Sequence, residues 1–351
     1  MLLTPIFANY KNLYFNVGEA LESAIQVFIF FTIIMLCGIR NITENLYNKI
    51  IRTYLLISLY VCLFGIYQFI SLNFIELPFD RLYYSTPSFA GTIVESYFNG
   101  WIRACSIFKE PGHFGFFVAN SLIISTFVSR NFISLKTKIF HSILASIALL
   151  LSNSLTAFLG VLIIFSFTAW RKIGFFRSAI LISLFFTIFI FLFPEHRIIL
   201  LVSGIMSGDL SSLGDGSAIT RVLKIMIGIS IFLENPIFGI GGNQIGYYPT
   251  TFLNGLDWNE YGQKIYFTNF HILGILAESG IIGLLCYVIA ISLGTLHIQK
   301  HASKNTKLLS IYLLIFNVLS FDLPVFSPFR LLPLIIAFSI NIERKINNGH
   351  R

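Results

Sequence analysis

The chain carries little charge for its length. Only 11% of its 351 residues are charged, whereas soluble domains average roughly 25%. In contrast, 56% of the residues are hydrophobic, and 38 of them are phenylalanine. The apolar residues form long runs, several of them near the ~20 residues that cross a bilayer core as a helix. The composition therefore excludes an ordinary soluble protein and predicts a polytopic integral membrane protein.

Motifs for disulfides and metals are also absent from the sequence. Three of the four cysteines lie in apolar runs, and no CxxC pair occurs, so neither a disulfide framework nor a zinc ribbon is expected. There is no HExxH, DxD or EF-hand spacing, and Asp209 and Asp215 lie in a Gly/Ser-rich stretch. The sequence predicts a metal-independent activity without a cofactor.

The apolar runs predict an all-α protein with about nine transmembrane helices, within a range of 8–11. The expected spans lie near residues 21–39, 54–72, 114–129, 139–152, 155–170, 178–194, 276–296, 308–322 and 329–341. The stretch 139–170 is apolar except for Ser152-Asn153-Ser154. A single helix of this length would measure about 48 Å, too long for one crossing. Basic clusters flank both ends, so two short helices joined by a tight external turn are expected.

The positive charge follows this topology. Loops assigned to the cytoplasm hold 15 of the 24 lysine and arginine residues and two acidic residues, while the rest of the chain holds 9 basic and 14 acidic residues. The net charge of +8 thus indicates orientation, with a cytoplasmic C-terminus, and not a nucleic-acid partner. The nine spans place Met1 outside. Either the N-terminal segment associates with the membrane, or the start of a longer protein is missing.

Two segments are too polar to cross the membrane and fall on the outer side of a single membrane domain, at residues 73–113 and 195–270. Loops of this length are usually functional or disordered, and their aromatic content argues against disorder. The sequence therefore places the chemistry on the outer face, with the active site expected in the larger loop.

The first loop ends with Arg103, Glu110, Pro111 and His113 just before an apolar run. Proline is favoured in the first turn of a helix, so a capped helix at the membrane entrance accounts for Glu110 and Pro111. It does not account for Arg103 and His113 beside them. This combination makes the segment a candidate for substrate binding.

The second loop carries Arg221 and Lys224 on one helical face, followed by Asn-Pro-Ile-Phe-Gly-Ile-Gly at 235–241. The glycines do not complete GxGxxG, and no βαβ pattern surrounds them. A turn that closes an amphipathic helix is the expected local structure.

A third segment follows, with Asn269, His271, Glu278 and Gly280 at the entrance to a span. His271 and Glu278 are seven residues apart and share a helix face about two turns apart. Ionisable residues near apolar segments are candidates for function. An interfacial histidine with a satisfied hydrogen bond is the alternative for His271.

Together, in this order, the three segments resemble the O-antigen polymerase/ligase superfamily of bacterial membrane glycosyltransferases. The resemblance is carried by Arg-x-x-Ser-x-Phe-x-Glu-Pro at 103–111, by Arg221 with the glycine segment 235–241, and by Asn269-x-His271 with Glu278-x-Gly280. It covers residues 90–290 and implies a GT-C-like fold.

The resemblance implies action on glycans linked to undecaprenyl diphosphate at the periplasmic face of the bacterial inner membrane. The implied partners are the lipid-linked donor and acceptor, the bilayer, a chain-length regulator and a flippase. Glu-Pro-Gly-His at 110–113 favours a polymerase that extends repeat units. A ligase that transfers glycan to lipid A-core is the alternative.

Roles for single residues follow from the resemblance and from chemical need. Arginines can neutralise a diphosphate leaving group without a metal, and histidine suits proton removal from a sugar hydroxyl. Glu278 could orient the site, and Glu110 could bind sugar hydroxyls or act as a second base. The predicted catalytic residues are His271, Arg221 and Glu278, and the predicted substrate-binding residues are Arg103, Glu110, Arg197, Lys224 and His113.

Other classes fit less well. A flippase or transporter of the same lipid-linked sugars is the second alternative, but transporters commonly show internal repeats and charges at the membrane midplane. No repeat is evident, and the charges concentrate in the external segments. An intramembrane protease would need a nucleophile and base within the spans, and no such pair is expected from the sequence.

Overall fold

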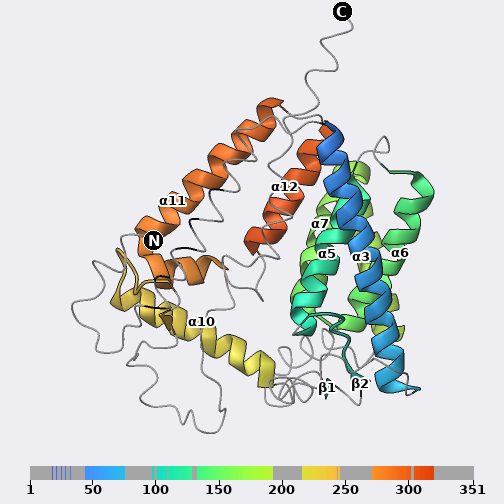
Figure 1. Ribbon diagram of the computed structural model, residues 1–351, viewed down its shortest axis with the longest axis horizontal. Coiled ribbons are helices and arrows are strands. Elements are labelled where there is room, and N and C mark those ends of the chain that lie inside the picture. Colours follow the sequence, from blue (N-terminus) through green and yellow to red (C-terminus); the bar gives the residue numbers. More distant parts are fainter. Residues whose placement is uncertain are drawn as a thin grey trace, which may run out of the picture. The chain divides into compact units, whose positions relative to one another are not determined.

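The computed structural model describes residues 44–75, 97–98, 101–108, 110–128, 133–192, 216–242, 244–245, 271–301 and 304–319, with positions 18, 21, 25, 28 and 32. Eight long helices account for most of these residues (Figure 1). They are α3 Glu44–Asn73, α5 Pro111–Phe127, α6 Leu135–Ser152, α7 Leu155–Ile173, α8 Phe175–Leu192, α10 Gly216–Glu234, α11 His271–His301 and α12 Lys304–Leu319. Two short antiparallel strands, β1 Tyr97–Phe98 and β2 Trp101–Ile102, precede α5.

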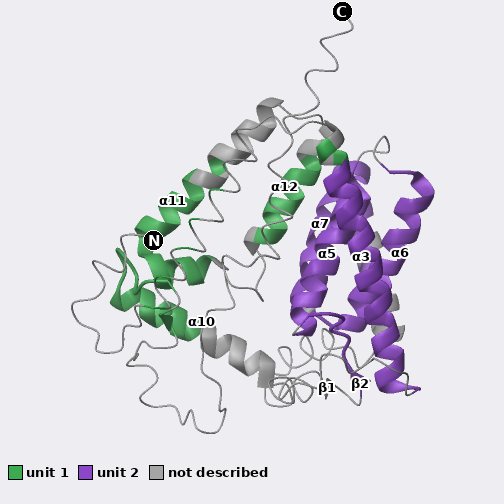
Figure 2. Ribbon diagram, viewed as in Figure 1, with its two compact units in different colours: residues 1–48, 219–351 green, residues 49–218 purple. Residues whose placement is uncertain are grey.

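The chain divides into two compact units (Figure 2). Unit 2 contains residues 49–218, and unit 1 contains residues 1–48 and 219–351. The interpretation of 73–113 and 195–270 as periplasmic loops of a single membrane domain stays a prediction.

The prediction of an all-α membrane protein is confirmed in its main part. Four described helices are long and apolar enough to cross a membrane, over Asn48–Asn73, Leu135–Ser152, Thr156–Ile173 and Ile272–Ile289. Shorter apolar helices cover Ile225–Glu234 and Leu308–Asn317. The expected spans 21–39 and 329–341 lie outside the described residues, apart from four isolated positions in the first. The count of nine and the GT-C-like fold remain predictions.

The expected helix pair in the apolar stretch 139–170 is confirmed. α6 ends at Ser152, Asn153 adopts a left-handed conformation with φ of 45°, and α7 begins at Leu155. A left-handed residue after the last helical turn is a common way to end a helix, and asparagine tolerates it better than most residues. The interruption by three small polar residues thus marks the turn.

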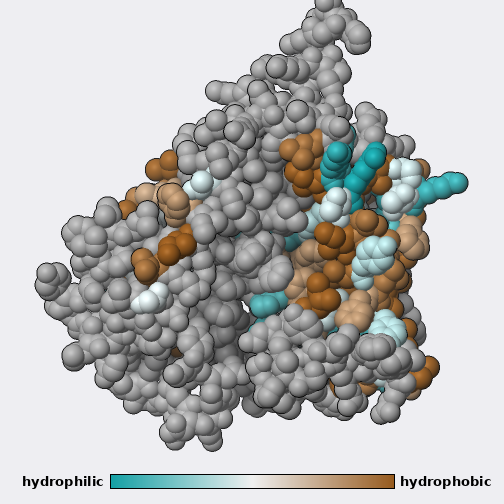
Figure 3. All heavy atoms as spheres, viewed as in Figure 1, coloured by the Kyte–Doolittle hydropathy of each residue, from teal (hydrophilic) through white to brown (hydrophobic). Residues whose placement is uncertain are grey.

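Helix α5 forms the interior of unit 2. Thirteen of its 17 residues are buried, as expected for a helix that is hydrophobic on every side. The surrounding helices instead expose large apolar side chains, among them Ile57, Phe140 and Ile163 at 48%, 57% and 56%. Hydrophobic residues cover much of the visible face of unit 2 (Figure 3). This pattern suits helices that face lipid around a protein-buried helix.

In unit 1, helix α11 is broken at Gly280, where φ is 63° and ψ is −165°. The segment 235–241, here called the glycine loop, fills the break with four backbone hydrogen bonds. The amides of Ile240 and Gly241 donate to the carbonyls of residues 277 and 278, and the amides of residues 281 and 282 donate to the carbonyls of residues 236 and 237. Both glycines are required sterically: a Cβ on Gly239 would lie 2.4 Å from the Glu278 carbonyl carbon, and one on Gly280 would lie 2.2 Å from the Ile237 oxygen.

The close packing of the glycine loop against Gly280 leads to a prediction about the stability of glycine variants. Gly280→Ala should lower the free energy of unfolding by more than Gly174→Ala. Gly174 has a φ of 84° and ψ of 164° but no atom within 4 Å of an added Cβ. Backbone strain of about 1–3 kcal/mol applies at both positions, and only Gly280→Ala adds a backbone clash.

Thermal unfolding of the detergent-purified variants measures the difference. Equal losses of thermal stability at the two positions would contradict a tightly packed crossing of loop and helix.

Candidate functional site

The segment 101–108 of unit 2, here called the strap, carries the first sequence motif and is anchored to α3. The side-chain oxygen of Gln68 accepts hydrogen bonds from the backbone amides of Cys105 and Ser106, at 2.9 and 2.8 Å. Ser106 returns a hydrogen bond from its hydroxyl to the Val61 carbonyl, at 2.8 Å. All of these strap residues are buried, so the helix side chain supplies partners that irregular backbone otherwise lacks in an apolar interior.

A second anchor lies at the end of α3. The Asn73 side chain donates to the Ile102 carbonyl at 2.9 Å and accepts from the Ile102 amide at 2.7 Å. The Ala104 amide donates to the carbonyl of Leu151 in α6, at 3.1 Å. Residues 102 and 104 are thus fixed by different helices.

Arg103 lies between these two anchors and is half-buried. Because its neighbours on both sides are hydrogen-bonded to the helix ends, its backbone has a fixed place. Trp101 is 44% exposed and packs its ring against Phe69 and Phe74, with centroids 6.1 and 5.1 Å away. A fixed arginine beside a partly exposed tryptophan can bind an anionic sugar derivative.

Glu110 and His113 are brought together at the start of α5. Pro111 occupies the first turn of α5, as the sequence predicted, and Glu110 is the N-cap residue without a side-chain capping bond. Its carboxylate instead lies 3.9 Å from His113 Nε2, and the Glu110 side chain is 45% exposed. Buried Phe108, in contact with Phe114 and Phe117, fixes the turn. The pair offers a carboxylate and an imidazole to a hydroxyl-bearing ligand.

In unit 1, Glu278 is buried, at 6% exposure, two residues before the break at Gly280. The glycine loop bonds to its carbonyl, and loop, α10 and α11 share an apolar cluster of Ile227, Ile231, Ile240, Ile245 and Ala277. The second and third sequence motifs are therefore parts of one backbone arrangement. The sequence analysis expected the glycines of segment 235–241 to form only a local turn, but they also contact α11, which is distant in sequence.

The other predicted site residues of the larger loop are placed only in part. Arg221 and Lys224 lie in α10, and His271 is the first residue of α11, while their side chains and all of Arg197 lie outside the described residues. His271 and Glu278 share the helical stretch before Gly280. Arg103, Glu110 and His113 belong to unit 2, whereas Lys224, His271 and Glu278 belong to unit 1. Their roles remain predictions.

Sequence reasoning did not identify Gln68 and Asn73. Both are amide side chains in or at the end of an apolar span, and a polar residue in such a span is a functional candidate by default. Their polarity within an apolar span could have marked Gln68 and Asn73 as candidates. It could not have identified the strap residues to which they are hydrogen-bonded. The packing of the glycine loop against the break in α11 carried no sequence signal beyond the glycines themselves.

One Ser–His pair does occur within the spans, although none was expected. Ser58 Oγ of α3 lies 3.2 Å from His141 Nε2 of α6, and both side chains are buried. His141 Nδ1 has no hydrogen-bond partner among the described residues, so the third group that orients the base in a hydrolase triad is not seen there. The pair is better explained as a contact between helices.

The described residues contain no group of three or more His, Cys, Asp or Glu side chains that could hold a metal ion. Metal independence stays a prediction, since many of the loop residues lie outside this part of the chain.

Because Gln68 accepts hydrogen bonds from two strap amides, substitutions that remove its side-chain oxygen should lower the stability of the protein. Gln68→Met keeps the volume but leaves the amides of Cys105 and Ser106 without their acceptor, at a cost of about 1–3 kcal/mol for each buried amide. Gln68→Glu keeps an oxygen at that place and should stay closer to the parent. Thermal unfolding in detergent compares the two variants. Equal stability of Gln68→Met and the parent would show that the strap is held by other contacts.

Comparison with known proteins supports the interpretation of the motifs. A family model described as O-antigen ligase (Wzy_C) matches residues 140–288, a segment that includes Arg221, His271, Glu278 and the glycine loop. A search of curated proteins gave no match. The strap, Glu110 and His113 precede the matched segment. The match over residues 140–288 supports the resemblance to the O-antigen polymerase/ligase superfamily that the motifs indicated.

Proposed function

We propose that this protein polymerises oligosaccharide repeat units linked to undecaprenyl diphosphate, forming O-antigen or capsular polysaccharide at the periplasmic face of the bacterial inner membrane. The observation that carries the proposal is the family segment 140–288, in which Arg221, His271 and Glu278 occur together with the glycine loop. The described apolar helices and the family indicate a multi-pass membrane protein, where a lipid-linked substrate is available.

The proposed reaction is a glycosyl transfer without a metal. His271 accepts the proton of the attacking sugar hydroxyl, whose oxygen forms a bond to the anomeric carbon of the donor. The bond from that carbon to the diphosphate oxygen breaks, and the electron pair leaves with undecaprenyl diphosphate. Arg221, aided by Lys224 or Arg197, stabilises the charge that develops on the leaving group. The proton then passes from His271 to solvent.

The strap and the start of α5 are assigned the remaining roles in this proposal. Arg103 binds a diphosphate or acidic sugar, and Glu110 with His113 binds sugar hydroxyls. Glu278 is assigned a positioning role, because it is buried beside the break in α11 and its backbone carbonyl is bonded to the glycine loop.

Ligation to lipid A-core is the second candidate function, favoured by the description of the matching family as O-antigen ligase. The two functions use the same donor and differ in the acceptor. The Glu-Pro-Gly-His segment at 110–113 precedes the matched residues and supports the polymerase.

Gene deletion separates the two candidates. Loss of the proposed polymerase should leave surface glycan of a single repeat unit on lipid A-core, because transfer of unextended units continues. Gel electrophoresis of lipopolysaccharide from the deletion strain, with and without a plasmid copy, measures chain length. Complete absence of glycan from lipid A-core, with long lipid-linked chains accumulating, would instead identify a ligase.

Point variants test the assigned residues in the same strain. Arg221→Ala and His271→Ala should each lower long-chain product by about a hundredfold or more, from lost charge stabilisation and lost base catalysis. Arg221→Lys should recover only part, since lysine keeps the charge but not the bidentate geometry. Arg171→Ala, an exposed arginine in the last turn of α7, is the matched control. Normal chain length with either variant at parental protein levels would refute the assignment.

A further inference from the structure

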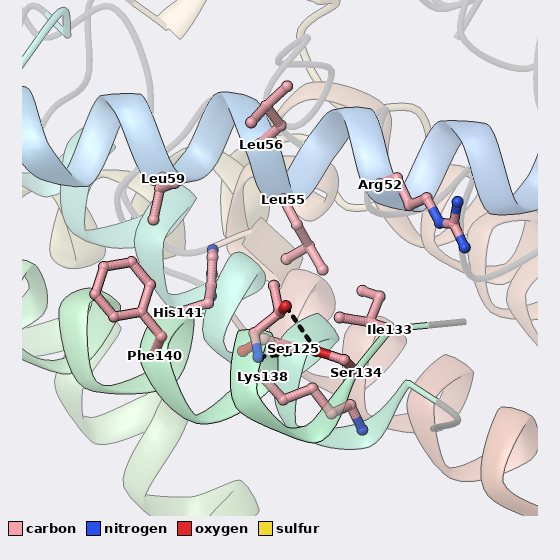
Figure 4. A pocket seen from close by; sticks show the side chains of 11 residues that line it. Arg52, Leu55, Leu56, Leu59, Ser125, Ile133, Ser134, Lys138, Phe140 and His141 are labelled. Carbon is pink, nitrogen blue, oxygen red and sulfur yellow. Dashed lines mark hydrogen bonds between the residues drawn. The ribbon is translucent and has the colours of Figure 1, made fainter. Parts of the chain in front are cut away.

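Unit 2 contains a second candidate binding site, a cavity of about 410 Å³ between α3 and α6 (Figure 4). It lies at the opposite end of unit 2 from the strap. The strap is tied to Asn73 and Leu151, near the C-terminal ends of α3 and α6, whereas the cavity is lined by Arg52, Ser134 and other residues from the N-terminal parts of these helices. None of the residues assigned to the glycosyl transfer contributes to it.

One end of the cavity is cationic. Arg52 extends from α3, Lys138 from α6, and the Ser134 hydroxyl lies beside them (Figure 4). Lys138 Nζ donates a hydrogen bond to the Val128 carbonyl, which holds the ammonium group near the end of α5. The described lining contains no acidic residue. Two cations from different helices therefore favour an anionic group here.

The rest of the lining is largely apolar. Leu59 of α3 lies near Phe140 of α6, and Leu55 of α3 extends toward the middle of the cavity (Figure 4). Leu56 and Phe140, which also line the cavity, are 53% and 57% exposed. On helices of membrane-spanning length, such exposed apolar side chains face lipid. A ligand that fits must combine an anionic head with a hydrocarbon chain.

The lining also includes a buried polar side chain. His141 lines the cavity and is 4% exposed, and its Nδ1 has no hydrogen-bond partner among the described residues. A buried polar atom without a partner is costly and uncommon in proteins.

We propose that this cavity binds an anionic phospholipid of the surrounding leaflet, with its phosphate between Arg52 and Lys138 and a chain against Leu55, Leu59 and Phe140. Basic pockets between transmembrane helices on the cytoplasmic side are suited to such headgroups, and the sequence places both cations on that side. The bound lipid joins α3 to α6 at the end opposite the strap.

Native mass spectrometry of the full chain, with phosphatidylglycerol or phosphatidylcholine added in detergent, tests the proposal. Wild type should retain phosphatidylglycerol in preference to phosphatidylcholine. The double variant R52Q/K138Q should bind it about thirtyfold more weakly, as expected for two surface-proximal cations. The matched control K49Q/K136Q removes two exposed cations from the same helices without touching the cavity and should bind like wild type.

Leu59→Trp is the second test, because it fills the apolar end and leaves every charge in place. It should also weaken phosphatidylglycerol retention. If R52Q/K138Q and K49Q/K136Q lose phosphatidylglycerol retention equally, general surface charge explains the binding and the proposal is overturned. Retention unchanged by Leu59→Trp, equal retention of phosphatidylcholine by wild type, or displacement of the lipid by inorganic phosphate alone would also overturn it. The glycan phenotype is read separately, so failure here leaves the proposed transfer activity untouched.

Discussion

The hydrogen bonding of irregular backbone in an apolar chain is the constraint on which both candidate sites depend. Water is scarce in the bilayer core, so a helix can break only where other groups of the protein replace its lost hydrogen bonds. In unit 1 the glycine loop does this for the break at Gly280, through amides and carbonyls on both sides. The side chain of Glu278 can therefore be held beside a discontinuity in a membrane helix, which is where transport and transfer sites in membrane proteins often occur.

Unit 2 meets the same constraint with side chains. Gln68 and Asn73 on α3 present amide groups to the strap, and these polar residues are tolerated in an apolar span because their partners are buried with them. Fixing the strap also fixes the backbone on both sides of Arg103. In each unit a candidate functional residue is adjacent to backbone that is anchored by another element, and anchoring of this kind is what a pre-organised charge-stabilising site requires.

The membrane helices and the turn at Asn153 could be predicted from the sequence, because hydrophobic run length and charge placement are local signals. The motifs that carry Arg103, Glu278 and the glycines were also visible as residues. Their contacts could not be predicted, since Gly280 and Ile237, or Gln68 and Ser106, are about 40 residues apart and sequence spacing does not encode such pairing. The Ser58–His141 contact was missed for the same reason. The cavity beside Lys138 was not predicted, because the sequence analysis had already explained the basic residues there as signals of membrane orientation.

The most direct measurement of the central claim is elongation by the purified protein in vitro. The substrate is a single repeat unit linked to undecaprenyl diphosphate, supplied alone and then together with lipid A-core. The account predicts lipid-linked products of several repeat units and release of undecaprenyl diphosphate from the lipid-linked unit alone, without added metal. Products formed only when lipid A-core is present, each carrying one unextended glycan, would contradict it and identify the acceptor as lipid A-core.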